Sequence, residues 1–250
     1  MAASDRTVYT HHLWIGAWIA AFGVGALVWG MIFWCVIRYR RRKQGIPRQI
    51  RYNLPIEILY TVTPFIMIGV LFYFTVLTQD KVQAKVAKPQ HQITVVAQKW
   101  NWSFNYQEAD NPDVGKAVWE AGTIEHPANL YLPVGETVRF NLKSVDVIHS
   151  FWVPAFYEKL DVIPGRRASI DLTPTKEGVF AGKCAELCGT YHSAMLFNVH
   201  IVSHDEYVAH LKELAAKGQT GQLKSLQHPS AVPQRPTEAQ EEAKKAAGRG

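Results

Sequence analysis

The sequence contains few cysteines and has no Cys-x-x-Cys-His motif. Three cysteines occur in 250 residues. Because that motif attaches haem covalently, its absence excludes a c-type haem site in this chain. Cys35 lies inside an apolar run, where we expect it to pack as a small apolar residue. The other two cysteines, Cys184 and Cys188, lie close together and carry the main chemical signal of the sequence.

Charged residues are absent from residues 13–37, a stretch of 25 positions. This length exceeds the roughly 20 apolar residues that are needed to cross the hydrocarbon core of a bilayer. A second apolar stretch, residues 55–78, contains a single charged residue, Glu57. We therefore predict two transmembrane helices, at 13–37 and 55–78, because a buried helix of a soluble protein is rarely this long.

Acidic residues are absent from residues 38–54, which connect the two apolar stretches. This loop holds seven basic residues: Arg38, Arg40, Arg41, Arg42, Lys43, Arg48 and Arg51. The net charge of +6 could indicate a nucleic-acid partner. Between two spans, however, a basic loop indicates a cytoplasmic segment, so no nucleic acid is expected. Both termini then lie on the outer side, and residues 1–12 lack the basic leader of a cleavable signal peptide.

Glu57 lies near the cytoplasmic end of the second predicted span. An ionisable residue at membrane depth is a candidate functional residue by default. The alternative is a glutamate at the interface that reaches water or pairs with Arg51.

The chain after the membrane spans has the pattern of a β domain. A polar linker at 79–92 precedes runs rich in Val, Ile, Phe and Tyr, at 93–106, 129–132, 137–144, 168–172, 179–183 and 196–202. Short strands without intervening helices predict a β-sandwich or barrel over 93–203. Ser203 and Glu206 form a capping box that opens a helix over 204–218. Residues 219–250 hold too few apolar residues to fold alone, so we expect a disordered or partner-bound tail.

Cys184, Cys188, His192 and Met195 form the densest group of soft and borderline metal ligands in the sequence. A mixture of thiolate, imidazole and thioether suits copper better than a hard cation. Upstream, His149 lies where an apolar strand is expected to meet a loop. A mononuclear blue-copper site needs only one cysteine, so the second cysteine is informative.

Other interpretations of these residues remain open. In an oxidising compartment the two cysteines could form a disulfide. They could also belong to a zinc site. A methionine three residues after a histidine could simply pack in a core.

The pattern closely resembles the dinuclear copper centre, CuA, of subunit 2 of bacterial aa3-type haem-copper cytochrome c oxidases. The resemblance extends over residues 13–203, including 159–166, and implies a transmembrane hairpin followed by a cupredoxin-like Greek-key sandwich. It implies two copper ions, with these ligands: His149, Cys184, the carbonyl of Glu186, Cys188, His192 and Met195. It also implies that the Glu186 side chain binds Mg²⁺ shared with the catalytic subunit, and that Glu57 lies at the mouth of a proton channel.

The resemblance implies an oxidoreductase complex in the plasma membrane of a bacterium. This chain would accept electrons from a soluble or tethered c-type cytochrome and pass them to haem a in the catalytic subunit. Oxygen reduction and proton pumping would belong to that other subunit, and further oxidase subunits and lipid would surround the chain. A quinol oxidase subunit lacks the copper ligands, and nitrous-oxide reductase needs a propeller domain that 250 residues cannot hold. A membrane-tethered copper-binding module outside an oxidase is the remaining alternative.

Residues 99–106 are rich in aromatic residues, and strand alternation predicts that most of these rings lie in the core. The resemblance implies that the first, Trp100, is exposed near copper and is where electrons enter. Asn101 replaces the tyrosine that the family usually has there. The acids among residues 107–125 could steer a basic cytochrome. Asp146 matches a docking acid of the family, whereas the uncharged Val145 hints at a tethered partner.

Overall fold

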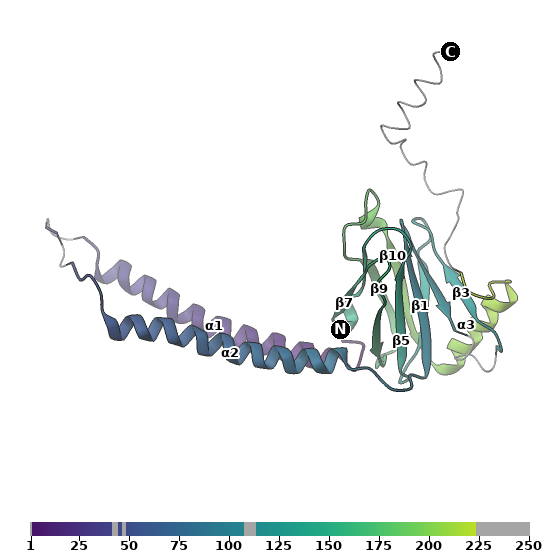
Figure 1. Cartoon of the computed structure of the whole chain (residues 1–250), viewed down its shortest axis with the longest axis horizontal. Helices are drawn as coiled ribbons and strands as arrows, with labels where there is room; N and C mark the ends of the chain where they lie inside the picture. The colour runs from purple at the N-terminus through teal and green to yellow at the C-terminus, as the bar shows by residue number, and fades with distance from the viewer. Residues whose placement is uncertain (1, 42–44, 47–48, 108–113, 224–250) are drawn as a thin grey trace, which may run out of the picture.

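Two long helices and a β-sandwich make up the described part of the chain (Figure 1). The computed structural model describes residues 2–41, 45–46, 49–107 and 114–223. Helices α1 (Thr7–Arg38) and α2 (Leu54–Gln83) lie side by side and project from the sandwich. Most of the tail expected over 219–250 lies outside the described residues, which end at 223.

The surfaces of both helices are apolar and exposed. The helices are 32 and 30 residues long, and no residue of their most apolar stretches is buried within the chain. A surface of this kind is stable only against lipid or an apolar partner. Pro55 lies in the first turn of α2, where its missing N–H costs no helical hydrogen bond. Both helices extend beyond the apolar stretches 13–37 and 55–78.

The β domain consists of two five-stranded sheets. Their strands are β1 (His91–Gln98), β2 (Asn101–Tyr106), β3 (Val118–Ala121), β4 (Ala128–Pro133), β5 (Val138–Ser144), β6 (His149–Val153), β7 (Glu158–Val162), β8 (Ala168–Leu172), β9 (Gly178–Cys184) and β10 (Leu196–Val202). The orders are β3-β2-β1-β5-β8 and β4-β10-β9-β6-β7. The β1–β5 and β4–β10 pairs are parallel, and the other pairs are antiparallel. The predicted fold class, a helical hairpin followed by a cupredoxin-like sandwich, is confirmed.

Aromatic rings fill the space between the two sheets. Trp102 and Phe104 of β2 pack edge-on against Phe197 of β10, and Phe151 of β6 stacks on the same ring. Edge-to-face and offset-stacked pairs of this kind are favoured arrangements for aromatic rings. Gly182 of β9 is required here, because a Cβ at this position would lie 2.1 Å from the Phe197 ring.

The run 93–106, predicted as one strand, forms two antiparallel strands. Gln98 pairs with Asn101, so the chain reverses at Lys99 and Trp100. Trp102, Phe104 and Tyr106 are fully buried, as alternation predicts. Trp100 precedes β2 and is only half-buried, so it does not share their core face. Strand periodicity cannot reveal a tight reversal inside a β-rich run.

The stretch 107–125, expected to be a charged loop, contains strand β3. Glu108, Asp110 and Asp113 lie outside the described residues. Glu120 is only 9% exposed, and its carboxylate receives hydrogen bonds from His210 and from the backbone of Asn129. The expectation that Glu120 helps steer a partner is therefore wrong, because its charge faces the interior.

The residues before α1 are part of the sandwich. Ala3 is fully buried, and its backbone exchanges hydrogen bonds with Ala155 and Thr175. The carboxylate of Asp5 accepts a hydrogen bond from the backbone N–H of Thr173. The N-terminal segment therefore ties the start of α1 to the β domain.

A buried ion pair ties the segment after α2 to the same domain. The Asp171 carboxylate is fully buried and receives two hydrogen bonds from Arg139, at 2.8 and 2.5 Å. The Asp171 carboxylate also accepts a hydrogen bond from the backbone N–H of Val86, with 2.8 Å between nitrogen and oxygen. Burial alone would raise the pKa of Asp171, but these hydrogen bonds outweigh it and lower the pKa.

Helix α3 (His204–Ala216) covers strands β3 and β4. It begins at the predicted capping box of Ser203 and Glu206, and Tyr207, Leu211 and Leu214 on its inner face are buried. The chain then turns back, and the backbone of Leu223 exchanges two hydrogen bonds with the Asn105 side chain.

Replacing Asp171 with alanine should destabilise the domain by about 3 kcal/mol, because Arg139 then keeps a partly buried charge without its partner. The measurement is denaturant unfolding of the full chain in detergent. Asp161→Asn is the control, since its exposed pair with Lys159 should contribute under about 1 kcal/mol. The Asp171 contribution should be present above pH about 4, the ordinary Asp range, and should be lost as pH falls through its lowered pKa. Equal stability of the two variants would contradict this assignment.

Candidate metal centre

The candidate ligands come from two segments that the second sheet brings together. Cys184 ends β9 and His149 begins β6, and these strands pair with Phe151 opposite Cys184. The loop after Cys184 carries Cys188, passes through the short 3-10 helix η3 (His192–Ala194) and returns at Met195. The backbone N–H of Cys184 donates to the carbonyl of Met195 at 3.0 Å, which closes this ligand loop.

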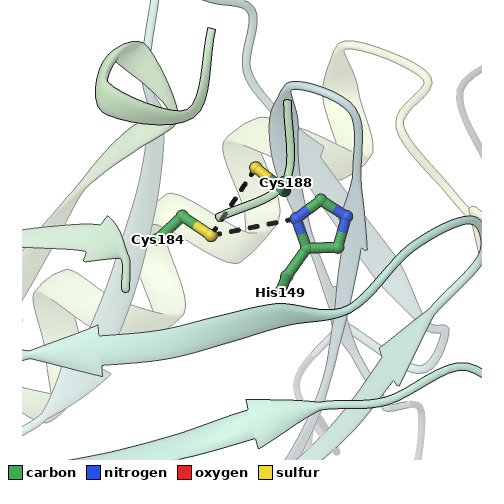
Figure 2. Close-up of side chains that lie close together, drawn as sticks. All are labelled: His149, Cys184 and Cys188. Atoms are coloured by element: carbon green, nitrogen blue, oxygen red, sulfur yellow. Dashed lines mark hydrogen bonds between the residues drawn. The ribbon is translucent and has the colours of Figure 1, made fainter. Parts of the chain in front are cut away.

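The cluster has two sulfur atoms at its centre. Figure 2 shows Cys184, Cys188 and His149 facing one another, with their ligand atoms within 4.8 Å. The sulfurs are 3.9 Å apart. The Sγ of Cys184 lies 3.8 Å from His149 Nδ1 and 3.3 Å from the carbonyl oxygen of Glu186. The structure thus places this half of the expected ligand set around one thiol.

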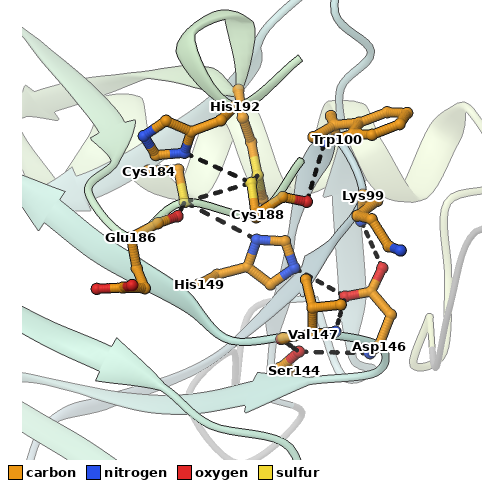
Figure 3. A network of polar contacts seen from close by, with 11 residues as sticks. Lys99, Trp100, Ser144, Asp146, Val147, His149, Cys184, Glu186, Cys188 and His192 are labelled. Carbon is orange, nitrogen blue, oxygen red and sulfur yellow. Dashed lines mark hydrogen bonds and ion pairs between the residues drawn. The ribbon is translucent and has the colours of Figure 1, made fainter. Parts of the chain in front are cut away.

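The second thiol has a corresponding set of neighbours. The Sγ of Cys188 lies 3.5 Å from His192 Nδ1 and 3.8 Å from the thioether sulfur of Met195. Each cysteine therefore has one imidazole and one weaker donor beside it. Figure 3 shows five of the six residues expected as ligands in one cluster. The sixth, Met195, joins them through its contact with Cys188.

Both cysteines are free thiols, so the disulfide interpretation does not describe this structure. The zinc interpretation is disfavoured by the donors, because a thioether and a backbone carbonyl beside two thiols suit copper better. Two buried thiols with one buried and one half-buried imidazole beside them fit a soft metal cation.

The pKa values of the two thiols are shifted in opposite directions. Burial opposes ionisation of Cys184, but hydrogen bonds with His149 and with the backbone near Glu186 and Ser150 outweigh it and lower the pKa. Burial raises the pKa of Cys188, and the nearby charge of Cys184 raises it further. The pair therefore favours a single thiolate until a metal cation replaces the second proton.

Asp146 orients the first histidine. Its carboxylate accepts a hydrogen bond from Nε2 of His149 at 2.7 Å, and the backbone N–H groups of Lys99 and Val147 donate to it at 2.7 and 2.6 Å. This arrangement directs Nδ1 of His149 toward the sulfurs, as carboxylates commonly do for metal-ligating histidines. The family resemblance implied a docking role for Asp146 and gave no indication of this contact, although Asp146 lies three residues before His149.

Trp100 lies against the ligand loop. Its indole N–H donates to the carbonyl of Cys188 at 3.3 Å, and its ring packs edge-on against Tyr191. Gly189 permits this approach, since a Cβ there would lie 3.1 Å from the indole. Its φ of 122° also favours glycine. Trp100 therefore contacts the cluster while remaining half-exposed.

Three of the exposed residues near this site are large and apolar. Val145 and Ile148, on either side of Asp146, are 37% and 45% exposed, and Leu187 on the ligand loop is 77% exposed. The position directly before Asp146 is occupied by the uncharged Val145. The sequence analysis noted Val145 but did not identify Ile148 or Leu187.

Glu186 and Glu57 differ in their relation to the cluster. Figure 3 shows the carbonyl of Glu186 facing Cys184 and its carboxylate directed away. Glu57 lies at the end of α2 that is distant from the sandwich (Figure 1), and the structure does not bring it near the cluster. Its carboxylate accepts the backbone N–H of Asn53 at 2.8 Å, so it caps the start of α2.

Comparisons with known proteins identify the family of this chain. The family described as cytochrome c oxidase subunit II, periplasmic domain, matches residues 91–202, and the corresponding transmembrane domain matches residues 2–76. A probable cytochrome c oxidase subunit 2 of Streptomyces avermitilis is 47% identical, over 84% of this chain and 76% of that protein. Cytochrome c oxidase subunit 2 of Mycobacterium tuberculosis is 35% identical, over 87% and 75%.

A similar solved structure is the periplasmic domain of subunit II of cytochrome oxidase from Bradyrhizobium japonicum. It is 29% identical, with a TM-score of 0.46 over 53% of this chain and 99% of that one. The family matches cover both the helical hairpin and the sandwich, and the sequence relatives cover most of the chain. The chain therefore belongs to the cytochrome c oxidase subunit 2 family, as a membrane-anchored subunit of that oxidoreductase.

Proposed function

We propose that this chain is the subunit through which electrons enter an aa3-type cytochrome c oxidase. It accepts single electrons from a c-type cytochrome and delivers them to haem a in the catalytic subunit, where O₂ is reduced to water with proton pumping. The observation that carries this proposal is the cluster in which two buried thiols, 3.9 Å apart, each have an imidazole beside them.

The residues proposed to hold two copper ions are His149, Cys184, Glu186 through its carbonyl, Cys188, His192 and Met195. When bound, such a dinuclear centre supplies a one-electron carrier. The two halves of the cluster, each with a thiol, an imidazole and a weaker donor, support a site that would hold two ions. The protein shields four of these residues from solvent: His149 and Met195 are 0% exposed, and the two cysteines are at most 5% exposed. Exclusion of water and fixed ligand positions limit the reorganisation that accompanies electron transfer.

The remaining roles follow from the resemblance and from position in the chain. The Glu186 carboxylate, directed away from the sulfurs, is proposed to bind Mg²⁺ at the boundary with the catalytic subunit. Glu57 is proposed to lie at the mouth of a proton channel, at the same end of α2 as the basic loop. The charge of that loop supports a bacterial plasma-membrane orientation with both termini outside.

The first test concerns the shared thiols. Cys184→Ser and Cys188→Ser should each abolish the purple absorption of a dinuclear copper centre and reduce the copper content below two ions per chain. Cys35→Ser is the matched control, since Cys35 lies in α1, far from the cluster. Absorption spectra and metal analysis of the purified oxidase provide the measurement. A parental spectrum in Cys188→Ser, or a colourless parent protein, would reject the dinuclear assignment and favour a simple binding module.

The second test concerns where electrons enter. Trp100→Ala should slow reduction by the cytochrome at least about tenfold, because truncating a central interface tryptophan typically costs this much or more. Copper content should stay at the parental value. Trp119→Ala, on β3, is the matched control and should transfer electrons at the parental rate. Stopped-flow reduction measures both variants, and a parental rate in Trp100→Ala would show that electrons enter elsewhere.

The third test concerns Asp146 as a positioning residue. Asp146→Asn should weaken copper retention against a chelator by roughly tenfold to a hundredfold, as for other residues that orient metal ligands. The absorption spectrum should shift, because the hydrogen bond to His149 changes. Asp161→Asn should retain copper as the parent does. If Asp146→Asn alters only cytochrome binding, with spectrum and retention unchanged, Asp146 is a docking acid and not a positioning residue.

A further inference from the structure

Trp102 is a buried aromatic residue that lies next to the candidate metal centre. It is the second residue of β2 and is fully buried, as is Tyr106 on the same strand. Its ring packs edge-on against Phe151 and Phe197 in the core. It also packs edge-on against the imidazole of His149, with the ring centroids 6.3 Å apart. The indole therefore extends from the interior of the sandwich to the cluster.

The indole N–H of Trp102 reaches the end of the ligand loop. It donates a hydrogen bond to the carbonyl oxygen of Met195 at 3.3 Å, in keeping with the need of a buried indole N–H for an acceptor. The same oxygen accepts a hydrogen bond from the backbone N–H of Cys184 at 3.0 Å. Since a carbonyl oxygen has two lone pairs, both are used at Met195. One oxygen atom thus joins β2, the end of β9 and the end of the loop.

The backbone of Met195 helps to determine where its sulfur atom lies. Met195 is fully buried and lies directly between η3 and β10. Its thioether sulfur is 3.8 Å from Sγ of Cys188. A methionine side chain is unbranched and has three rotatable bonds, so it does not hold its own sulfur firmly in place. The two hydrogen bonds to the Met195 carbonyl supply a constraint from the backbone side.

The other half of the cluster depends less on Trp102. The imidazole of His149 is oriented by the hydrogen bond from its Nε2 to Asp146 at 2.7 Å, and the indole adds ring packing to this contact. Trp102 therefore acts on Met195 through a directional hydrogen bond and on His149 through packing. Loss of the indole N–H should affect mainly the half of the cluster that contains Met195.

We propose that Trp102 is a positioning residue that holds Met195 in the copper centre and thereby helps to set the reduction potential of that centre. The inference rests on the proposed function, because it takes copper as the metal that the cluster holds. A weak thioether ligand tunes the reduction potential of copper, and residues that hold ligands tune a metal site without touching the metal. This role differs from that of Trp100, which is half-exposed and contacts the loop at Cys188.

The experiment uses the full chain purified in detergent, both free of copper and loaded with copper. Trp102→Phe keeps an aromatic ring in the core but removes the indole N–H. Tyr106→Leu is the matched control, because Tyr106 is a fully buried ring at the opposite end of β2. Its hydroxyl likewise bonds a backbone group, accepting from the N–H of Tyr131 at 2.9 Å. The measurements are hydrogen exchange, copper retention against a chelator, the absorption spectrum, the reduction potential and the melting temperature.

In the copper-free chain, Trp102→Phe should speed hydrogen exchange of the Cys184 amide by up to about tenfold, because the shared acceptor loses one of its hydrogen bonds. In the loaded chain, it should lower copper retention roughly tenfold. It should also shift the reduction potential in the same direction as Met195→Leu does. Tyr106→Leu should lower the melting temperature at least as much as Trp102→Phe, because a core ring is removed, with exchange, spectrum and potential at the parental values.

A double variant tests whether Trp102 acts through Met195. In a chain that already carries Met195→Leu, adding Trp102→Phe should change the reduction potential much less than it does in the parent chain, because the thioether is no longer present. Non-additivity of this kind is what a double-mutant cycle measures for residues in contact.

Three results would overturn the proposal. They are a parental spectrum and potential in Trp102→Phe, equal shifts in Tyr106→Leu, which would assign the effect to core packing, and full additivity of Trp102→Phe with Met195→Leu. Failure of the proposed function looks different, because the parent chain itself would then show no dinuclear copper spectrum.

Discussion

The antiparallel pairing of β6 with β9 is the constraint on which the metal centre depends. Phe151 lies opposite Cys184, and the backbone N–H of Ala185 donates to the carbonyl of Ser150. These contacts bring His149 to a cysteine 35 residues later in the chain. A slip of one residue would turn the His149 side chain to the opposite face of the sheet, so the register of one strand pair determines whether the cluster exists.

Two tryptophans connect this cluster to the rest of the sandwich. The indole of Trp100 donates to the carbonyl of Cys188, and the indole of Trp102 donates to that of Met195. The ligand loop is therefore held at two points, Cys188 within it and Met195 at its end, by side chains of the β1–β2 hairpin. One of these rings is half-exposed and the other fully buried, so the contacts that stabilise the loop also connect the cluster to the surface.

The sandwich is attached to the helical hairpin at both helix ends. Ala3 and Asp5 bind it before α1, and the pair of Arg139 with Asp171 holds the segment after α2. Two attachments restrict rotation of the domain more than a single linker would.

The sequence by itself determined the two long apolar helices, the β class of the domain that follows and the residues that meet in the candidate metal centre. These features depend on local quantities, such as the length of an apolar run, strand-like composition and the spacing of cysteine, histidine and methionine. Tertiary structure alone decided that Trp100 leaves its strand, that Glu120 faces the interior and that Asp146 orients His149. The physical reason is that periodicity indicates which face of an element a residue occupies, whereas the charge and hydrogen bonding of a side chain depend on what a distant segment places opposite that face.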